Sequence, residues 1–428
     1  MNLRNSLLVA LTALVVASPL AAQDRISLGI TYRPGVRPGM LVVAGPGLDS
    51  VRKIVERDLL FSDRYEMAIV PDDAGPQTGP FSAPLYASMG LTWAVELSAV
   101  TGGVEARLHH LPSGEVRHRV VRGMDVSGVG TERLRIHQLS DELLEKSVGG
   151  VGIAATRILF QYQDNIWSVD SDGANLMRMS NGTGIAMSPA WSPDGRKFAY
   201  LELRDYAGVL VLQNPMTGAR QTVPRPSGGG QAATPAFSPD GSTLAFAMST
   251  ESGTDIFAVD IARMCCVRQL TASGKLADNM NPAYSPDGRR VAFMSTRPGR
   301  GQIYVMDADG ANQRILVPFD GMAAGASYAP EWSPDGDRVA FHRDIAGGKQ
   351  VLVYDFGSGQ SRAVTSAGTN EDPSWAPDSR HLVFRSSRSP AGQLWVLDTE
   401  SGSLRRLTNL GGLARMPAWS PTLQGNNP

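Results

Sequence analysis

Few side chains in this sequence have the type and spacing that catalysis needs. Gly325-Ala-Ser327-Tyr-Ala329 approximates the turn that exposes a nucleophilic serine in hydrolases. That turn requires a strand before it, a helix after it, and a histidine and a carboxylate elsewhere in the same domain. The sequence after Ser327 is a series of short β-rich segments and supplies no such domain. We therefore expect no catalytic residue in this chain.

Histidines and carboxylates give no convincing metal site. The chain has no His-x-x-x-His or Cys-x-x-Cys spacing. His109 and His110 are adjacent in a predicted strand and so point to opposite faces, and we assign His137 a structural role. The loops that begin at Asp170 and Asp307 faintly resemble calcium loops, but tight turns need the same residues. We expect no metal site and no cofactor, with an incidental calcium ion in such a turn left open.

The two cysteines, Cys265 and Cys266, are adjacent. A bond between neighbours falls outside the Cα separation that disulfides usually have. We therefore expect both to be buried thiols in a strand.

The N-terminus has the pattern of a secretory signal peptide. Arg4 precedes an apolar run at residues 7–16, and small residues follow up to Ala22. The run is shorter than the roughly 20 residues of a spanning helix, and no cysteine follows it to accept a lipid. We expect cleavage after Ala22, a periplasmic protein and no direct membrane insertion. The 41 acidic and 40 basic residues nearly balance, so nucleic acid is not an expected partner.

One phrase recurs from residue 189 onward, first as Pro189-Ala-Trp-Ser-Pro-Asp-Gly195 and with drift in the last two of its six copies. The second proline of the copies stands at positions 193, 239, 286, 334, 377 and 421, a spacing of 43 to 48 residues. Ser-Pro-Asp-Gly suits a tight hairpin turn, and β-rich runs after each copy complete four strands, A to D. The period is typical of β-propeller blades.

The two ends of the repeat array complete each other. Residues 158–160 and 166–170 read as strands B and C with no phrase before them, whereas residues 417–420 read as a strand A with only a short tail behind. Pairing of residues 417–420 with residues 157–161 would close the ring and leave no open seam. We predict an all-β six-bladed β-propeller over residues 151–428, closed by the C-terminal strand.

Residues 23–150 lack the phrase and read as a mixed α/β domain. Strands are expected at residues 40–44 and 65–70 and a hairpin at residues 91–99 and 104–111. Helices are expected after Asp49 and over residues 132–145. We predict a small mixed sheet with helices packed on it.

The order of these parts resembles the TolB family, the periplasmic β-propeller proteins of the Tol-Pal system. The resemblance rests on His137-Gln-Leu-Ser-Asp141, on Gly149-Gly-Val-Gly-Ile153 running into the first blade, on the six phrases and on Pro417-Ala-Trp-Ser-Pro421. It covers essentially the whole mature chain. The Gly45-Pro-Gly loop is short, and Ser379 replaces a turn glycine.

The resemblance implies a non-enzymatic scaffold. Such a protein docks a peptidoglycan-associated lipoprotein on one propeller face and engages inner-membrane Tol proteins through its N-terminal arm and first domain. It supports outer-membrane integrity and constriction at division. The alternatives are a propeller-based hydrolase, peptidase or lyase, or a periplasmic ligand sensor.

The candidate binding residues lie where the blades differ in sequence. The A-to-B and C-to-D turns share one side of the ring, so the D-to-A and B-to-C connections lie on the other, around the mouth of the channel. The predicted partner-binding residues are Gln231, Asn279, Met280, Ser327, Tyr328, Asn370, Glu371 and Arg415. We expect Met280, Tyr328 and Arg415 to anchor the lipoprotein, and residues 23–38 to form the arm that meets the inner-membrane partner.

Overall fold

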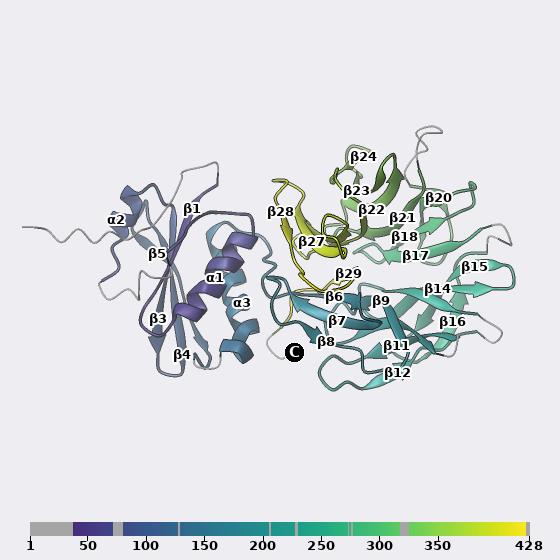
Figure 1. The fold of residues 1–428 in the computed structure, drawn as a ribbon, viewed down its shortest axis with the longest axis horizontal. Coiled ribbons are helices and arrows are strands. Elements are labelled where there is room, and N and C mark those ends of the chain that lie inside the picture. The colour runs from purple at the N-terminus through teal and green to yellow at the C-terminus, as the bar shows by residue number, and fades with distance from the viewer. Residues whose placement is uncertain are drawn as a thin grey trace, which may run out of the picture.

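The computed structural model describes residues 37–71, 80–126, 129–204, 207–226, 230–272, 274, 277–316 and 325–424. A five-stranded sheet with helices precedes six four-stranded sheets arranged as a ring (Figure 1). The predicted signal peptide, and the arm except for its last two residues, lie outside the described residues. Within those residues, no helix is long and apolar enough to cross a membrane.

The N-terminal sheet is mixed and has the strand order β2-β1-β3-β4-β5. Its strands are β1 (Gly39–Ala44), β2 (Glu66–Ala68), β3 (Trp93–Val100), β4 (Gly103–His110) and β5 (Glu115–Gly123). Strand β1 runs parallel to β2 and β3, and the remaining pairs are antiparallel. A parallel β1 between two neighbours is buried on both faces, which explains why its sequence is apolar throughout.

Helices cover both faces of this sheet. Helices α1 (Asp49–Phe61) and α3 (Val129–Ser147) pack on the face that carries Met40 and Val42 of β1. The short helix α2 (Ala83–Ser88) covers part of the other face, where Leu41 and Val43 lie. The predicted helices and hairpin are confirmed. Strand β5 and helix α2 were not predicted, because β5 is charged and largely exposed and α2 has only six residues.

The six predicted blades are confirmed, each with four antiparallel strands. From the channel outward the strands are β29 (Arg415–Trp419), β6 (Arg157–Tyr162), β7 (Asn165–Asp170) and β8 (Met177–Arg178) in blade 1; β9 (Ile185–Trp191), β10 (Phe198–Arg204), β11 (Ala207–Gln213) and β12 (Arg220–Thr222) in blade 2; β13 (Ala232–Phe237), β14 (Thr243–Thr250), β15 (Gly253–Asp260) and β16 (Cys265–Gln269) in blade 3; β17 (Asn279–Tyr284), β18 (Arg290–Ser295), β19 (Gln302–Asp307) and β20 (Arg314–Ile315) in blade 4; β21 (Ser327–Trp332), β22 (Arg338–Ile345), β23 (Gly348–Asp355) and β24 (Gln360–Ala363) in blade 5; and β25 (Asn370–Trp375), β26 (His381–Ser386), β27 (Gln393–Asp398) and β28 (Leu404–Arg406) in blade 6.

Strand A of each blade contacts strand A of both neighbouring blades, so these six strands form the innermost ring. Strand B lies behind it and is buried on both faces, since the blades stack against each other. Each strand B contributes one fully buried aromatic ring at the same repeat position: Phe160, Tyr200, Phe246, Phe293, Phe341 and Phe384. These rings fill the space between neighbouring sheets, and strand B of blade 2 buries a second ring, Phe198.

The predicted closure by the last strand is confirmed. Strand β29 pairs antiparallel with β6, with Trp419 opposite Ile158. The indole Nε1 of Trp419 donates to Oγ1 of Thr156 at 2.8 Å. The backbone N of Ser420 donates to the carbonyl of Arg157 at 2.8 Å. Blade 1 is therefore assembled from both ends of the propeller sequence.

The expectation of buried cysteine thiols is wrong. The sulfurs of Cys265 and Cys266 are bonded to each other at the start of β16. Cys266 is exposed and Cys265 is half-buried, because β16 is the outermost strand of blade 3. The backbone permits a bond between neighbours here because Cys266 has a φ of 62°, a left-handed conformation that an ordinary strand residue does not adopt.

The N-terminal domain docks on the side of the ring that carries the Ser-Pro-Asp-Gly turns, which we call the turn side. Arg133 of α3 donates from Nε to Asp170 at 3.1 Å and pairs with Asp172, both in the C-to-D turn of blade 1. Arg57 of α1 also pairs with Asp172, whose side chain is only 1% exposed. The guanidinium group of Arg405 lies 4.2 Å from the centre of the Phe61 ring. The interface is thus a buried network of charges.

Further contacts join the domains at blades 1 and 6. Nε2 of Gln138 in α3 donates to the carbonyl of Leu423 at 3.0 Å, just beyond the closing strand. Asp63, at the end of α1, accepts from Arg380 through its carbonyl and lies 3.4 Å from Nε2 of His381. These contacts all involve the turn side, and the described residues of the N-terminal domain lie at that end of the propeller, away from the channel mouth (Figure 1).

We predict that closure by β29 dominates the stability of the propeller. Trp419→Ala removes a side chain that is 7% exposed and also breaks its bond to Thr156, so the free energy of unfolding should fall by about 3–5 kcal/mol. Urea denaturation measures this loss. Leu413→Ala, at a side chain 40% exposed just before β29, is the control and should change the free energy by less than about 1 kcal/mol. Equal losses in the two variants would contradict the prediction.

Candidate partner-binding site at the channel mouth

The same backbone irregularity occurs in strand A of all six blades. The residue before the first proline of each phrase has a positive φ, between 47° and 53°, although none is glycine: Ser188, Thr234, Asn281, Ala329, Asp372 and Met416. At this point the register between strands A and B shifts in every blade. Such a bulge redirects the side chains on either side of it.

The bulge sorts neighbouring positions by exposure. The side chains three residues before each proline are buried, whereas those one and two residues before it are partly exposed in all six blades. We call these twelve partly exposed residues the mouth ring. The members two residues before the proline are Met187, Ala233, Met280, Tyr328, Glu371 and Arg415. The members one residue before it are the six with positive φ.

Four of the eight predicted binding residues belong to the mouth ring, namely Met280, Tyr328, Glu371 and Arg415. Gln231 lies just before β13 and is exposed. The repeat brings the first four to equivalent places in successive blades, so their side chains surround the same opening.

The other three predicted residues are fully buried and have internal partners. Nδ2 of Asn370 donates to Gln350 at 2.7 Å, and Nδ2 of Asn279 donates to Asp255 at 3.0 Å. The hydroxyl of Ser327 accepts from Nε of Arg343 at 2.9 Å. Asn279 and Asn370 thus join strand A to strand C of the preceding blade, and Ser327 joins strand A to strand B of its own blade. These side chains hold the mouth ring in place and do not themselves reach its surface.

The mouth carries a cluster of charges on blades 5 and 6. Nζ of Lys349 lies 2.7 Å from Glu371, and Arg385 pairs with the other oxygen of the same carboxylate. Nε of Arg415 donates to the side chain of Gln161 at 2.8 Å. Burial raises the pKa of Asp372, and the charges of Lys349 and Arg415 oppose this shift.

An aromatic surface borders these charges. The Tyr328 ring stacks on His342 with 5.4 Å between ring centres, and Nζ of Lys349 lies 5.6 Å from the centre of the Tyr328 ring. Nδ1 of His342 accepts from the backbone N of Asp372 at 3.1 Å. Burial lowers the pKa of His342 to about 3, and Lys349 adds to the effect, so this imidazole is neutral. A neutral, hydrogen-bonded histidine holds the tyrosine ring in a fixed position.

The sequence reading overlooked Glu331. The equivalent residue after the proline in the other blades is small: Ala190, Ala236, Ala283, Ser374 and Ala418. The Glu331 carboxylate reaches the neighbouring blade, where it accepts from the backbone N of Trp375 at 2.9 Å and from the hydroxyl of Ser374 at 3.0 Å. Burial raises its pKa to about 7 against these hydrogen bonds. The signal was present, since this is the only copy of the phrase with a charge at that place.

Among the residues that the structure describes, two groups of histidine and carboxylates lie close enough to share an ion, and both are at the domain interface. They consist of Asp58, His137 and Asp172, and of Asp63, His381 and Asp398. Their carboxylates are held by guanidinium groups, Asp172 by Arg133 and Asp398 by Arg380. Burial alone would lower the pKa of His137, but Asp58 and Asp170 outweigh it and raise the pKa to about 10. His137 is thus a charged structural residue.

The two loops that resemble calcium sites form C-to-D turns. Asp170 is bound by Arg157 at 2.9 Å and belongs to the interface, and Asp307 accepts from Asn312 at 2.6 Å. In each loop a glycine N donates to the backbone carbonyl of the first aspartate, Gly173 to Asp170 at 2.8 Å and Gly310 to Asp307 at 2.9 Å. Both loops therefore form the turns that the sequence predicts.

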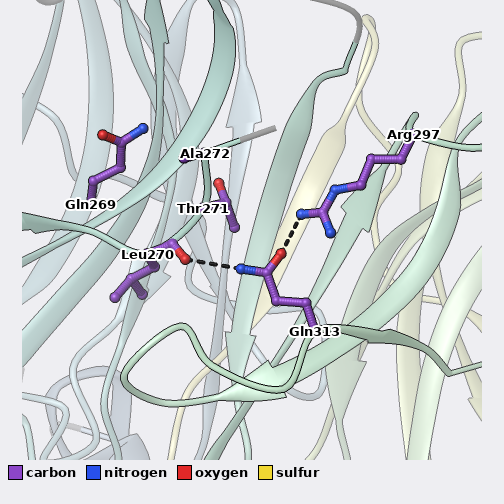
Figure 2. A pocket seen from close by; sticks show the side chains of 6 residues that line it. All are labelled: Gln269, Leu270, Thr271, Ala272, Arg297 and Gln313. Carbon is purple, nitrogen blue, oxygen red and sulfur yellow. Dashed lines mark hydrogen bonds between the residues drawn. The ribbon is translucent and has the colours of Figure 1, made fainter. Parts of the chain in front are cut away.

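A separate pocket of about 550 Å³ lies between blades 3 and 4. In Figure 2, Gln313 crosses it, donating to the carbonyl of Leu270 and accepting from Arg297. Arg297 in turn lies over the rings of Phe293 and Tyr304. These side chains bind one another across the groove, so the pocket belongs to the contact between blades.

We predict that His342 makes stability depend on pH. Its pKa is about 3 when folded, against about 6.5 for an unperturbed histidine, so below pH 6.5 the unfolded chain takes up a proton that the folded chain does not. Stability from the neutral ring is complete above pH 6.5 and decreases toward pH 3, by up to about 1.4 kcal/mol per pH unit. His342→Gln should remove this component. The free energy of unfolding of both proteins, measured with urea between about pH 4 and 8, tests this prediction. The same pH dependence in both proteins would contradict it.

Comparison with known proteins supports one family. The model of the TolB β-propeller domain matches residues 145–423. The Tol-Pal system protein TolB of Anaeromyxobacter dehalogenans strain 2CP-1 is 32% identical over 226 residues, which are 48% of this chain and 51% of that protein. That of Actinobacillus succinogenes is 39% identical over 92 residues, 20% of this chain and 22% of that protein. The chain thus spans at most about half the length of these curated relatives in the matched regions.

Solved structures agree on the fold. The crystal structure of TolB from Acinetobacter baumannii covers 92% of this chain and 98% of its own, with a TM-score of 0.77 and 24% identity. A chain of a nidogen/laminin complex is also similar, with a TM-score of 0.52 and 10% identity over 63% of this chain and all of that one. The first match extends over more of this chain than the second. Since the propeller model matches well over half of the sequence, this protein belongs to the TolB family.

Proposed function

We propose that this protein is a non-enzymatic scaffold of the periplasmic Tol-Pal system and that its mouth ring binds a peptidoglycan-associated lipoprotein. The observation that carries the proposal is the position of the ring. It lies on the side opposite the docked N-terminal domain, where partly exposed side chains from all six blades converge. Family membership supplies the class of partner.

The chemistry of the mouth suits a protein partner. Lys349 and Arg385 lie beside the mouth ring and, together with Arg415 of the ring, outnumber the acidic ring members Glu371 and Asp372, so these charges favour an acidic segment. Methionines and the fixed Tyr328 ring are adjacent and offer apolar contact area. Methionine, tyrosine and arginine are the residue types enriched at protein interfaces, and a rigid aromatic ring loses little entropy on binding.

Hydrolysis by Ser327 is poorly supported by the geometry. Its hydroxyl is buried and accepts a hydrogen bond from Arg343. Arginine is a proton donor, so it cannot act as the base that would remove the serine proton. The nearby His342 already uses Nδ1 to accept from Asp372, and burial keeps its pKa far below neutral. A scaffold needs neither group to react. A ligand sensor, in contrast to a scaffold, would bind a small molecule at the mouth in the absence of a protein partner.

Calorimetry with the soluble domain of the peptidoglycan-associated lipoprotein tests the proposal. The triple variant Met280→Glu, Tyr328→Ala and Arg415→Glu should weaken binding at least about 100-fold, because interface anchors of this kind each contribute about 1–2 kcal/mol or more. The control carries Arg196→Glu and Arg263→Glu, two exposed side chains on the turn side. Both proteins must retain the native circular dichroism spectrum. Unchanged binding by the mouth variant would refute the site.

We also propose that residues 23–38 engage the inner-membrane Tol partner. Arg37, near the described end of this segment, lies 3.4 Å from Asp63 and 3.4 Å from Glu66, so this end is close to the domain interface and on the side of the propeller opposite the mouth.

Deletion of residues 23–36 should therefore abolish binding to the inner-membrane Tol protein and leave lipoprotein binding within about twofold, since residues this far apart act additively. Co-purification with each partner separately measures both effects. The mouth variant provides the reciprocal control. Retained binding to the inner-membrane protein, or loss of both partners, would contradict the assignment of the arm.

A further inference from the structure

The disulfide between Cys265 and Cys266 has no part in the function proposed above. It joins the only two cysteines of the chain, at the point where the C-to-D turn of blade 3 becomes β16. The pair lies on the turn side, on the outermost strand of blade 3. The ion pairs and side-chain hydrogen bonds of the domain interface given above are at blades 1 and 6. Neither the mouth nor the domain interface requires a bond there.

The backbone around the pair departs from regular strand geometry. Met264 and Cys266 both have a positive φ, 53° and 62°. The register between β15 and β16 shifts between Ala258 and Asp260, so that Asp260 is opposite Cys265. A bond between neighbouring residues closes a ring through a single peptide unit. The bond therefore lies where the backbone and the strand register are both irregular.

The pair is also accessible. Cys266 is exposed and Cys265 is half-buried, and no strand of the described residues pairs with the outer edge of β16. Exchange between a thiol and a disulfide requires that the attacking thiolate reach one sulfur in line with the bond. Exposure of Cys266 makes its sulfur the one that is attacked. Structural disulfides, in contrast, are usually enclosed by the fold that they stabilise, and exposed ones are the labile or regulatory ones.

We propose that Cys265 and Cys266 form a redox-active pair that exchanges reversibly with dithiols, including proteins with a dithiol active site. A thiolate of the dithiol attacks Sγ of Cys266, forms a mixed disulfide there and displaces the Cys265 thiolate, which takes up a proton. The second thiol of the reductant then attacks its own sulfur in the mixed disulfide and releases the Cys266 thiolate, which is protonated in turn. Two electrons pass to the pair, and the reductant leaves as its disulfide.

Reduction creates a site as well as removing a bond. Two thiols on adjacent residues can bind one soft, thiophilic centre together, as trivalent arsenic does, whereas a single thiol cannot chelate it. Release of the ring also frees Cys266 to leave the left-handed region and allows β16 to pair with β15 without a shift. The oxidised and reduced proteins should therefore differ at this edge and agree at the mouth.

Thiol counting in the native, full-length mature protein tests the proposal. Iodoacetamide labelling followed by intact mass analysis should find no free thiol before treatment and both cysteines after dithiothreitol without denaturant. Phenylarsine oxide, added after reduction, should bind one per chain and protect both thiols. Oxidised glutathione should restore the unlabelled state.

Cys265→Ser and Cys266→Ser are the matched controls. Each should show one thiol without any reductant and should lose the protection by phenylarsine oxide. Two thiols labelled in the untreated wild type would show that the bond does not form, and a bond that resists dithiothreitol until the chain is denatured would show that it is structural; either result overturns the proposal. Lipoprotein binding measured in both redox states separates this site from the mouth, since it should not change.

Discussion

The pairing of β29 with β6 is the constraint on which the rest of the structure depends. If the ring were not closed, the strand edges of its first and last blades would be exposed to solvent. The last strand closes that seam and at the same time supplies Arg415 and Met416 to the mouth ring. The residues immediately after it reach α3 through Leu423. Residues 415–423 thus complete the ring, the candidate binding surface and the contact between domains.

The domain interface shows how charge can orient one domain on another. Burying ions is costly, and buried ion pairs often add little stability compared with apolar contacts. An incorrect arrangement would leave Asp172 or Arg405 buried without a counter-charge, however, and that is far more costly. The network therefore disfavours alternative poses. Because all of its propeller residues lie on the turn side, it also leaves the mouth open to a partner.

The sequence was informative wherever a physical pattern repeats. The Ser-Pro-Asp-Gly turns and their period predicted six blades and the closure, and four residues of the mouth ring were among the predicted binding residues. It failed where the outcome depends on tertiary contact. Asn279, Ser327 and Asn370 look like ordinary polar loop residues, yet the bulge turns them inward to partners that no local pattern reveals. The cysteine bond depends on an unusual φ at Cys266, and Glu331 stood out only as a departure within the repeat.

The prolines next to the six bulges limit how anything can be recognised at the channel. Strand A is the inner edge of every blade, and a free edge usually invites an extended peptide to add itself as another strand. Proline has no amide hydrogen to offer such a peptide, and the bulge beside it breaks the regular spacing of the remaining donors and acceptors. A peptide in the channel therefore cannot add to strand A through a regular ladder of main-chain hydrogen bonds. Selectivity must therefore come from side chains. When the partner changes, the residues around the rim can change with it while the shape of the ring stays the same.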